Sequence, residues 1–251
     1  MGRHGDVEVG QLGLPAGVQA CLFDLDGVLT QTASVHRAAW KETFDPIVRG
    51  AGQAAFTEAD YLQYVDGKRR ADGVRDFLAS RGLEFPEGSP DDPPEKDTIA
   101  GIGNRKNQIV LRRFKDNGVD VYEGSVAYLH ASRAAGMSIG VVTASANARA
   151  VLTAVDLTDC VDSLVDGAIA GREGLRGKPA PDTFVAAARA LGVEPPQAVV
   201  FEDALAGVAA GSAGGFGWVV GVDRAGQGDA LRRHGADVVV TDLSELLDPI
   251  R

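Results

Sequence analysis

The sequence predicts a doubly wound α/β core with a parallel sheet, interrupted by an inserted all-helical cap. Three observations support this fold class. Residues 119–251 alternate short apolar runs with helical segments, as in parallel sheets with crossover helices. An isolated apolar run at residues 20–23 ends in two acidic residues, and residues 34–118 carry helical patterns without a clear strand. We therefore expect a core formed by residues 18–33 and 119–251, and a cap formed by residues 34–118.

Composition narrows the possible partners and compartment. The 251 residues carry a net charge of −10 with a pI near 4.9, which argues against nucleic-acid binding because that requires clustered Lys and Arg. No apolar run approaches the ~20 residues that span a bilayer, so we expect no membrane segment. The polar, glycine-rich residues 1–17 predict a flexible tail. Cys21 and Cys160 lack metal-type spacing and indicate a reduced, cytoplasmic protein.

The first strand, residues 20–23, is a buried apolar run that stops at Asp24 and Asp26 and is followed by a glycine turn. Strand alternation directs both carboxylates the same way, at the strand end where α/β sheets bind ligands. Two adjacent negative charges call for a bridging cation or for a proton on one carboxylate. A plain Asp-x-Asp-Gly turn is the alternative, and this stretch alone does not decide between them.

The other elements follow in chain order. In the cap, helical patterns cover residues 34–44, 61–65, 74–78 and 109–114, with a Pro- and Asp-rich loop at 87–94. In the core, we predict strands at residues 137–142, 198–201, 218–222 and 237–240, an extended stretch at 163–169, and helices at 148–154, 181–191 and 205–213. A cap inserted directly after the first strand would cover the two acidic residues.

Polar side chains follow further strands of the predicted core. Residues 143–147 open a helix, where free backbone N–H groups either favour an anion or form an ordinary helix cap. Lys178 lies on a proline-rich turn, where it would neutralise a phosphate or stay solvated. Glu202 and Asp203 end a second apolar strand. Convergence of four carboxyl groups with one lysine would form a site for a hard cation.

These stretches together resemble the four motifs of the haloacid dehalogenase superfamily of phosphoryl-transfer enzymes: FDLDGVLT, VVTAS, GKPAPD and VFEDALAGVAAG, in this order. The resemblance implies a Rossmann-like core in which Asp24 is the nucleophile and Asp26 the general acid and base. It also implies that Thr143 and Lys178 bind the transferring phosphoryl group. The implied ligands of a single Mg²⁺ ion are Asp24, the carbonyl of Asp26, Glu202 and Asp203.

Within this superfamily, TQTASVHRAAW at residues 30–40 is similar to the T-x-T-x-x-x-H-x-x-A-W signature of β-phosphoglucomutases. The resemblance implies that Thr32 is a hinge, that His36 aligns Asp26 and that Trp40 mainly packs. In the cap, YVDGKRRADGV and GNRKN look like phosphate- and sugar-binding stretches, with Arg70 holding the phosphate that is not transferred. The residues implied to contact substrate are Thr32, His36, Trp40, Arg70, Lys106, Asn107, Ala144, Ser145 and Asn147.

The implied function is that of a Mg²⁺-dependent isomerase, which converts β-D-glucose 1-phosphate to D-glucose 6-phosphate through an aspartyl phosphate. Glucose 1,6-bisphosphate would be its activator and intermediate, and the enzyme is expected to act as a monomer. A sugar-phosphate phosphatase is the alternative, and a catalytically silent binding protein is least favoured because all four carboxylates are present. Ala146 stands where many of these mutases carry lysine, so that contact to the distal phosphate is missing or comes from Arg149 or Lys68.

Overall fold

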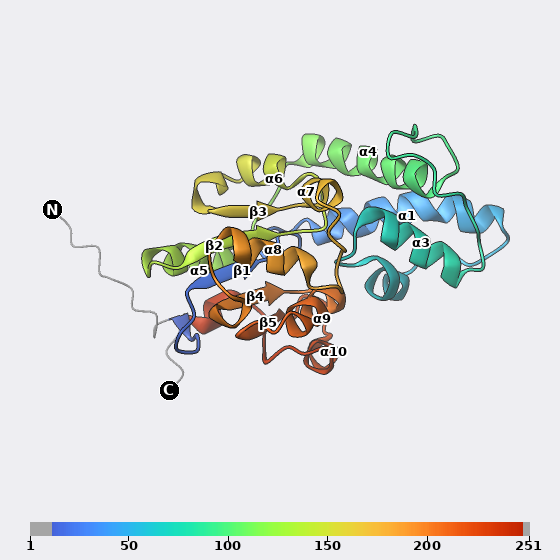
Figure 1. Ribbon diagram of the computed structural model, residues 1–251. Coiled ribbons are helices and arrows are strands. Elements are labelled where there is room, and N and C mark those ends of the chain that lie inside the picture. Colours follow the sequence, from blue (N-terminus) through green and yellow to red (C-terminus); the bar gives the residue numbers. More distant parts are fainter. Residues whose placement is uncertain (1–11, 248–251) are drawn as a thin grey trace.

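The computed structural model describes residues 12–247, which contain one six-stranded parallel sheet (Figure 1). Its strand order is β3-β2-β1-β4-β5-β6, so the chain winds outward from β1 in both directions. The strands are β1 (Ala20–Phe23), β2 (Ser138–Val142), β3 (Ser163–Val165), β4 (Ala198–Glu202), β5 (Trp218–Val222) and β6 (Val238–Val240). The winding reverses between β1 and β4, where doubly wound sheets open a crevice for ligands. The predicted fold class is confirmed.

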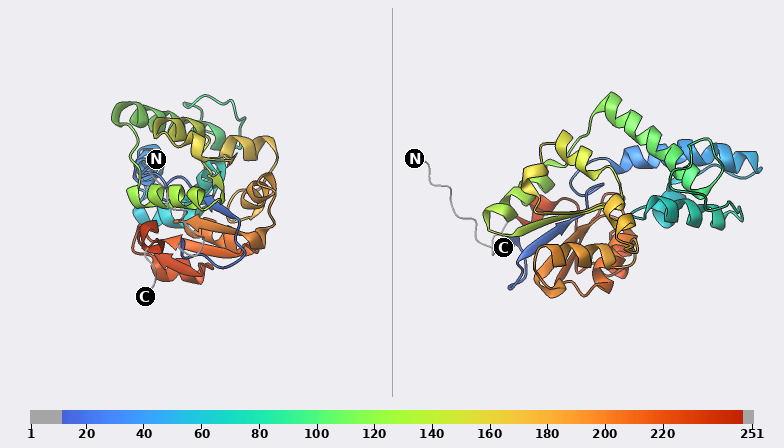
Figure 2. Two further views of the ribbon diagram at one scale, coloured as in Figure 1. Left: turned by 90° about the vertical axis from the view of Figure 1, so that its left-hand side faces the viewer. Right: turned by 45° about the horizontal axis from the view of Figure 1, so that its top comes forward.

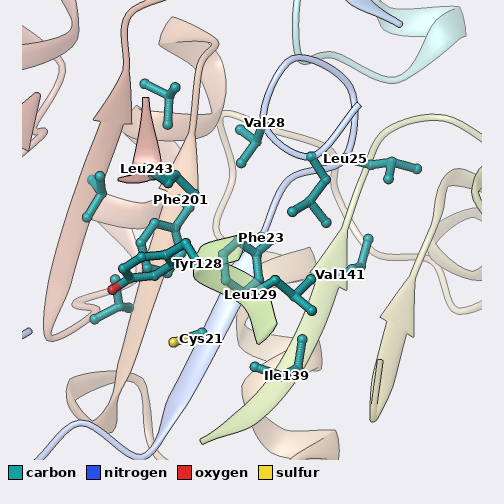
Figure 3. Close-up of a cluster of buried hydrophobic side chains, with 14 of the residues drawn as sticks. Cys21, Phe23, Leu25, Val28, Tyr128, Leu129, Ile139, Val141, Phe201 and Leu243 are labelled. Atoms are coloured by element: carbon teal, nitrogen blue, oxygen red, sulfur yellow. The ribbon is translucent and has the colours of Figure 1, made fainter. Parts of the chain in front are cut away.

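Helices cover both faces of the sheet because successive side chains of β1 point to opposite faces. On the face covered by α5 and α6, Phe23 stacks on Phe201 with ring centroids 4.6 Å apart, and Tyr128 packs against both rings (Figure 3). On the face covered by α8 and α9, Leu22 packs with Phe184. The core helices are α5 (Glu123–Ala134), α6 (Ala148–Ala154), α7 (Gly167–Arg172), α8 (Asp182–Ala190), α9 (Leu205–Ala213) and α10 (Gly228–Arg233), with 3₁₀ turns η3 (Thr158–Cys160), η4 (Pro195–Gln197) and η5 (Leu243–Leu246).

Between β1 and β2 the chain forms helices and loops that pack around an aromatic core of their own. Phe44 lies at its centre, with ring centroids 5.0 Å from Trp40, 5.2 Å from Phe56 and 4.4 Å from Phe77. The elements are α1 (Ala33–Gly50), α2 (Glu58–Asp60), the π-helical turn η2 (Tyr61–Val65), α3 (Arg70–Ser80) and α4 (Ile99–Asn117), gathered at one end of the core (Figures 1 and 2). No helix within residues 12–247 is long and apolar enough to cross a membrane.

Two parts of the core differ from the prediction. The extended stretch expected at residues 163–169 is a strand only to Val165, because the Asp166 side chain accepts a hydrogen bond of 2.8 Å from the backbone N–H of Ile169. This cap starts α7 where the sequence pattern suggested a longer strand. Helices α5 and α10 were not predicted, and α5 supplies Tyr128 to the main core.

The segment before β1 also differs from the expected tail of residues 1–17. Leu12 is fully buried in the main core, and its carbonyl accepts a hydrogen bond of 2.9 Å from the Tyr128 hydroxyl. A buried apolar side chain with a buried hydrogen bond holds the chain in place, so the prediction of a flexible tail is wrong at Leu12. Residues 1–11 lie outside the described residues.

We predict that Leu12→Ala lowers the free energy of unfolding by about 2–5 kcal/mol, because it removes a fully buried side chain and leaves a cavity. The matched control is Leu111→Ala on α4, where a leucine that is 44% exposed is expected to cost less than about 0.5 kcal/mol. Urea denaturation of both variants measures the difference. Equal stabilities would contradict the anchoring of this segment.

Candidate active site

The site begins where β1 ends, with the buried carboxylate of Asp24. The Lys178 ammonium lies 2.5 Å from Asp24 Oδ1, contacts Glu202 Oε1 and donates at 3.2 Å to the carbonyl of Val142. Burial alone would lower the pKa of Lys178, but the two carboxylates outweigh burial and hold it above its usual value. Burial raises the pKa of Asp24 well above its usual range, and the negative charges of Glu202 and Asp26 raise it further. The Lys178 ammonium lowers this pKa but does not offset these effects.

Glu202, at the end of β4, is fully buried and uses both carboxylate oxygens. Oε1 accepts from Lys178, and Oε2 accepts at 2.9 Å from the backbone N–H of Ala204. A Cβ at Gly207 would lie 1.8 Å from Oε1, so the glycine in the first turn of α9 leaves the room that this side chain needs. The structure therefore holds Glu202 as a partner of Lys178.

Asp203 lies over the turn that follows Asp26. Gly27 there has φ +101°, a conformation that favours glycine, and a Cβ on it would lie 1.9 Å from Asp203 Oδ2. Burial raises the pKa of Asp203 well above its usual value, and the carboxylates of Asp66, Glu202 and Asp24 raise it further. At this end of the sheet the carboxyl groups of Asp24, Glu202 and Asp203 therefore outnumber the Lys178 ammonium.

The predicted metal ligands lie at this end of the sheet, but their side chains are not arranged as a metal-binding cluster. Within residues 12–247, no group of three or more Asp, Glu, His or Cys side chains is arranged to hold a metal ion. The reason is that Lys178 stands between Asp24 and Glu202. The donors are all oxygens and carry excess negative charge, which fits a hard cation such as Mg²⁺.

Asp26 lies in a different environment from Asp24. Its Oδ1 accepts a hydrogen bond of 2.5 Å from Thr32 Oγ1, and its Oδ2 accepts one of 3.1 Å from Thr143 Oγ1. Burial would raise the pKa of Asp26, but the neighbouring His36 imidazole and the Thr32 hydroxyl overcome this effect, and the pKa lies below its usual value. Asp26 is therefore ionised at neutral pH.

His36 and Lys106 connect the cap to Asp26. His36 Nε2 lies 3.3 Å from Asp26 Oδ1 without an aligned hydrogen bond, while its Nδ1 lies 2.7 Å from the Lys106 Nζ. Lys106 is buried with its Nζ 4.9 Å from the centre of the Trp40 ring. Burial lowers the pKa of Lys106 to about 7, and burial together with the Lys106 charge lowers the pKa of His36.

A cavity of about 450 Å³ separates the cap from the ends of the strands. Arg70 lines it from the start of α3 and donates a long hydrogen bond of 3.4 Å to the carbonyl of Gly103. Asn147 of the core donates at 2.9 Å to Asn107 of the cap. Predicted site residues that line the cavity are Asp24, Asp26, His36, Trp40, Arg70, Lys106, Asn107, Thr143, Ala144, Ser145, Asn147 and Asp203, while Thr32, Lys178 and Glu202 lie behind its wall.

Ala146, which stands where many of these mutases carry lysine, lines the cavity. The sequence left open whether the contact of that lysine is missing or is supplied by Arg149 or Lys68. Lys68 lines the cavity too, but its ammonium donates at 2.7 Å to Asp76. Arg149 is exposed and lies outside the residues that line the cavity. Neither side chain, as placed here, presents a free charge beside Ala146.

Sequence reasoning missed part of the loop between η2 and α3. Burial raises the pKa of Asp66 to about 6, although the Tyr61 hydroxyl acts to lower it. Gly67 has φ +70°, and a Cβ there would lie 2.8 Å from the Cβ of Ala204, so this loop rests directly on the core. The Asp-Gly pair was a visible turn signal, but nothing local in the sequence shows what the turn touches.

A family model for haloacid dehalogenase-like hydrolases matches residues 18–215. The chain belongs to this family. The family predicted from the four motifs is thereby confirmed.

Individual relatives agree with this family. A curated protein of Mycobacterium bovis named beta-phosphoglucomutase is 54% identical over 246 residues, covering 94% of both chains. The validoxylamine A 7'-phosphate phosphatase of Streptomyces hygroscopicus is 30% identical over 92% of this chain and 97% of its own. The crystal structure of a beta-phosphoglucomutase from Clostridium difficile matches the fold with a TM-score of 0.74 at 24% identity, covering 91% of this chain and 93% of that one.

The contact between Lys106 and His36 yields a prediction. Lys106→Met keeps most of the side-chain volume and removes the charge that lowers the pKa of His36, so the pKa of His36 is expected to rise. NMR titration of the imidazole signals measures it. Lys115→Met, at an exposed position on the same helix, is the control and should leave the His36 titration unchanged. An unchanged or lowered pKa in Lys106→Met would show that the two groups are uncoupled.

Proposed function

We propose that this protein is a β-phosphoglucomutase, an isomerase that converts β-D-glucose 1-phosphate to D-glucose 6-phosphate. The observation that carries the proposal is a cavity that Asp24 lines from the core and Arg70 lines from the cap. Lys178 stands behind Asp24, so both the core side and the cap side of the cavity have a basic group. A sugar bisphosphate needs two such groups, one for the phosphate that is transferred and one for the phosphate that stays.

A phosphorylated Asp24 donates its phosphoryl group in the first half-reaction. A hydroxyl of glucose 1-phosphate attacks phosphorus, the bond from phosphorus to the Asp24 oxygen breaks, and Asp26 takes the hydroxyl proton. The low pKa of Asp26 suits this role, because the carboxylate is ionised before the hydroxyl arrives. The resulting bisphosphate turns around, Asp24 attacks its other phosphorus, the bond from that phosphorus to the sugar oxygen breaks, and Asp26 returns its proton to that oxygen.

Mg²⁺ would be held by Asp24, Asp203 and the carbonyl of Asp26. Glu202 would contribute indirectly, because its carboxylate holds the Lys178 ammonium beside Asp24. When bound, one such ion neutralises charge on the phosphoryl group during transfer. Excess negative charge around Asp203 supports this assignment. The Lys178 ammonium next to Asp24 offsets the repulsion between the carboxylate and an incoming phosphate.

The remaining predicted residues hold and orient the sugar. Thr32 and His36 bring the start of the cap against Asp26, so closure of the cap and alignment of the general base go together. The bond between Asn147 and Asn107 joins core and cap beside the cavity. Glucose 1,6-bisphosphate would phosphorylate Asp24 and would also be the intermediate that turns over in the cavity. We propose further that the enzyme is a cytoplasmic monomer.

A sugar-phosphate phosphatase is the second candidate, favoured by Ala146. This residue lines the cavity with a methyl group where a lysine would add a second charge for the distal phosphate. With weaker retention of that phosphate, water would complete the second half-reaction. The relative in Streptomyces hygroscopicus named as a phosphatase supports keeping this alternative.

The first test is conversion of β-glucose 1-phosphate to glucose 6-phosphate with Mg²⁺ and a trace of glucose 1,6-bisphosphate, measured alongside phosphate release. Rapid isomerisation with little phosphate release is expected. Asp24→Asn is expected to lower kcat by at least about a thousandfold, because the nucleophile is lost. Asp116→Asn, an exposed change on α4, is the control. Phosphate release without isomerisation would favour the phosphatase, and turnover retained by Asp24→Asn would exclude the aspartyl phosphate.

A second test concerns the metal ion. Chelation should abolish turnover, and Asp203→Asn should raise the Mg²⁺ concentration that gives half-maximal activity by about tenfold or more, because one charged ligand is lost. Binding is followed independently by the increase in melting temperature with Mg²⁺, which should need higher concentrations in the variant. A wild-type melting temperature that does not respond to Mg²⁺ would argue against the ion.

A further inference from the structure

Arg69, in the loop between η2 and α3 of the cap, reaches the core loop that carries Lys178. Its Nη1 donates at 3.0 Å to the carbonyl of Leu175. Its Nε donates at 2.7 Å to Asp72 on the first turn of α3, and Asp72 also accepts from Arg75 at 2.8 Å. Asp72 of the cap therefore holds the guanidinium, and the guanidinium donates to Leu175 of the core, which lies 106 positions further along the sequence.

Gly177, the residue before Lys178, is shaped to this contact. A Cβ built on Gly177 would lie 2.6 Å from Cγ, 2.8 Å from Nε and 2.9 Å from Cδ of Arg69, which are the three atoms nearest to it. Gly177 does not have a positive φ, so its backbone conformation does not require glycine. The close approach of the arginine stem is the reason that a side chain is excluded here.

Two residues before Arg69, the same cap loop contacts the other wall of the site. Gly67 packs against Ala204, which follows the carboxylates at the end of β4. The loop thus rests on both core segments that surround Asp24, one carrying Glu202 and one carrying Lys178.

We propose that Arg69 is a positioning residue, which fastens the closed cap to residues 175–177 and thereby fixes the Lys178 ammonium between Asp24 and Glu202. Its effect on turnover rests on the proposed function, whereas the contact itself does not. Two of its nitrogen donors, Nε and Nη1, are occupied by Asp72 and Leu175, so they serve the joint between cap and core. An ammonium held at the reacting phosphoryl group must be placed closely, because small displacements reduce catalysis steeply.

Kinetics of three variants test the proposal: Arg69→Ala, Gly177→Ala and the double variant. Each single change is expected to lower kcat about tenfold, to change KM less than about twofold and to increase phosphate release per isomerisation. The double variant should be no worse than Arg69→Ala, because the added methyl group then meets no arginine. Losses that multiply in the double variant, or a raised KM with unchanged kcat, would overturn the proposal, the latter pointing to a direct phosphate contact.

Arg81→Ala is the matched control. Arg81 also bonds a carboxylate, Asp60, and a backbone carbonyl, that of Ala54, but both partners lie within the cap. Its kcat and its phosphate release should match those of the wild type.

Hydrogen exchange without substrate tests the contact independently of activity. Peptides covering residues 173–180 should exchange faster in Arg69→Ala and in Gly177→Ala than in the wild type or in Arg81→Ala. If the wild type neither isomerises nor hydrolyses sugar phosphates, the proposed function fails while this measurement still tests the contact. Unchanged exchange in Arg69→Ala would show that Arg69 does not hold this loop.

Discussion

A single buried ammonium holds the end of the sheet together. Lys178 is almost fully buried and lies between Asp24 and Glu202, two carboxylates from neighbouring strands. Burying any one of these charges without a partner would cost too much free energy. The ends of β1 and β4 and the turn that carries Lys178 must therefore come together when the protein folds. Asp203 adds negative charge that the lysine does not neutralise, which is why this arrangement attracts a divalent cation.

The two acidic residues that follow β1 are separated by one position and yet have opposite surroundings. Asp24 faces core partners, and burial among negative charges raises its pKa. Asp26 accepts from Thr32, just before α1, and from Thr143, just after β2, and it lies beside His36 of the cap; its pKa is lowered. In the proposed reaction, the nucleophile would thus belong to the core alone, whereas the general acid and base would depend on His36 of the cap. Such a link between proton transfer and cap closure would limit the access of water at the step where water would compete.

The parts of this site that the sequence predicts are those with a local pattern. An apolar strand that ends in acidic residues places Asp24, Asp26, Glu202 and Asp203 at one sheet edge by topology alone, and the structure brings them there. The pairing of Lys178 with Glu202 depends on contacts between distant segments, so four similar carboxylates did not reveal which of them serves the lysine. The burial of Leu12 under Tyr128 was missed for the same reason, since a leucine in a glycine-rich stretch has no periodic neighbours.

Ala146, which departs from the mutase pattern, is exposed and lines the cavity, while Lys178 and Asp24 lie buried behind its wall or at its base. In the proposed function this placement separates the chemistry from the choice of substrate. A change at Ala146 would alter the charge offered to a distal phosphate but would leave the buried network of hydrogen bonds unbroken. Replacing a buried member would leave a charged partner unpaired, at a cost of several kcal/mol. The buried centre suits both the proposed mutase and the alternative phosphatase, and the charge offered beside Ala146 is what would distinguish them.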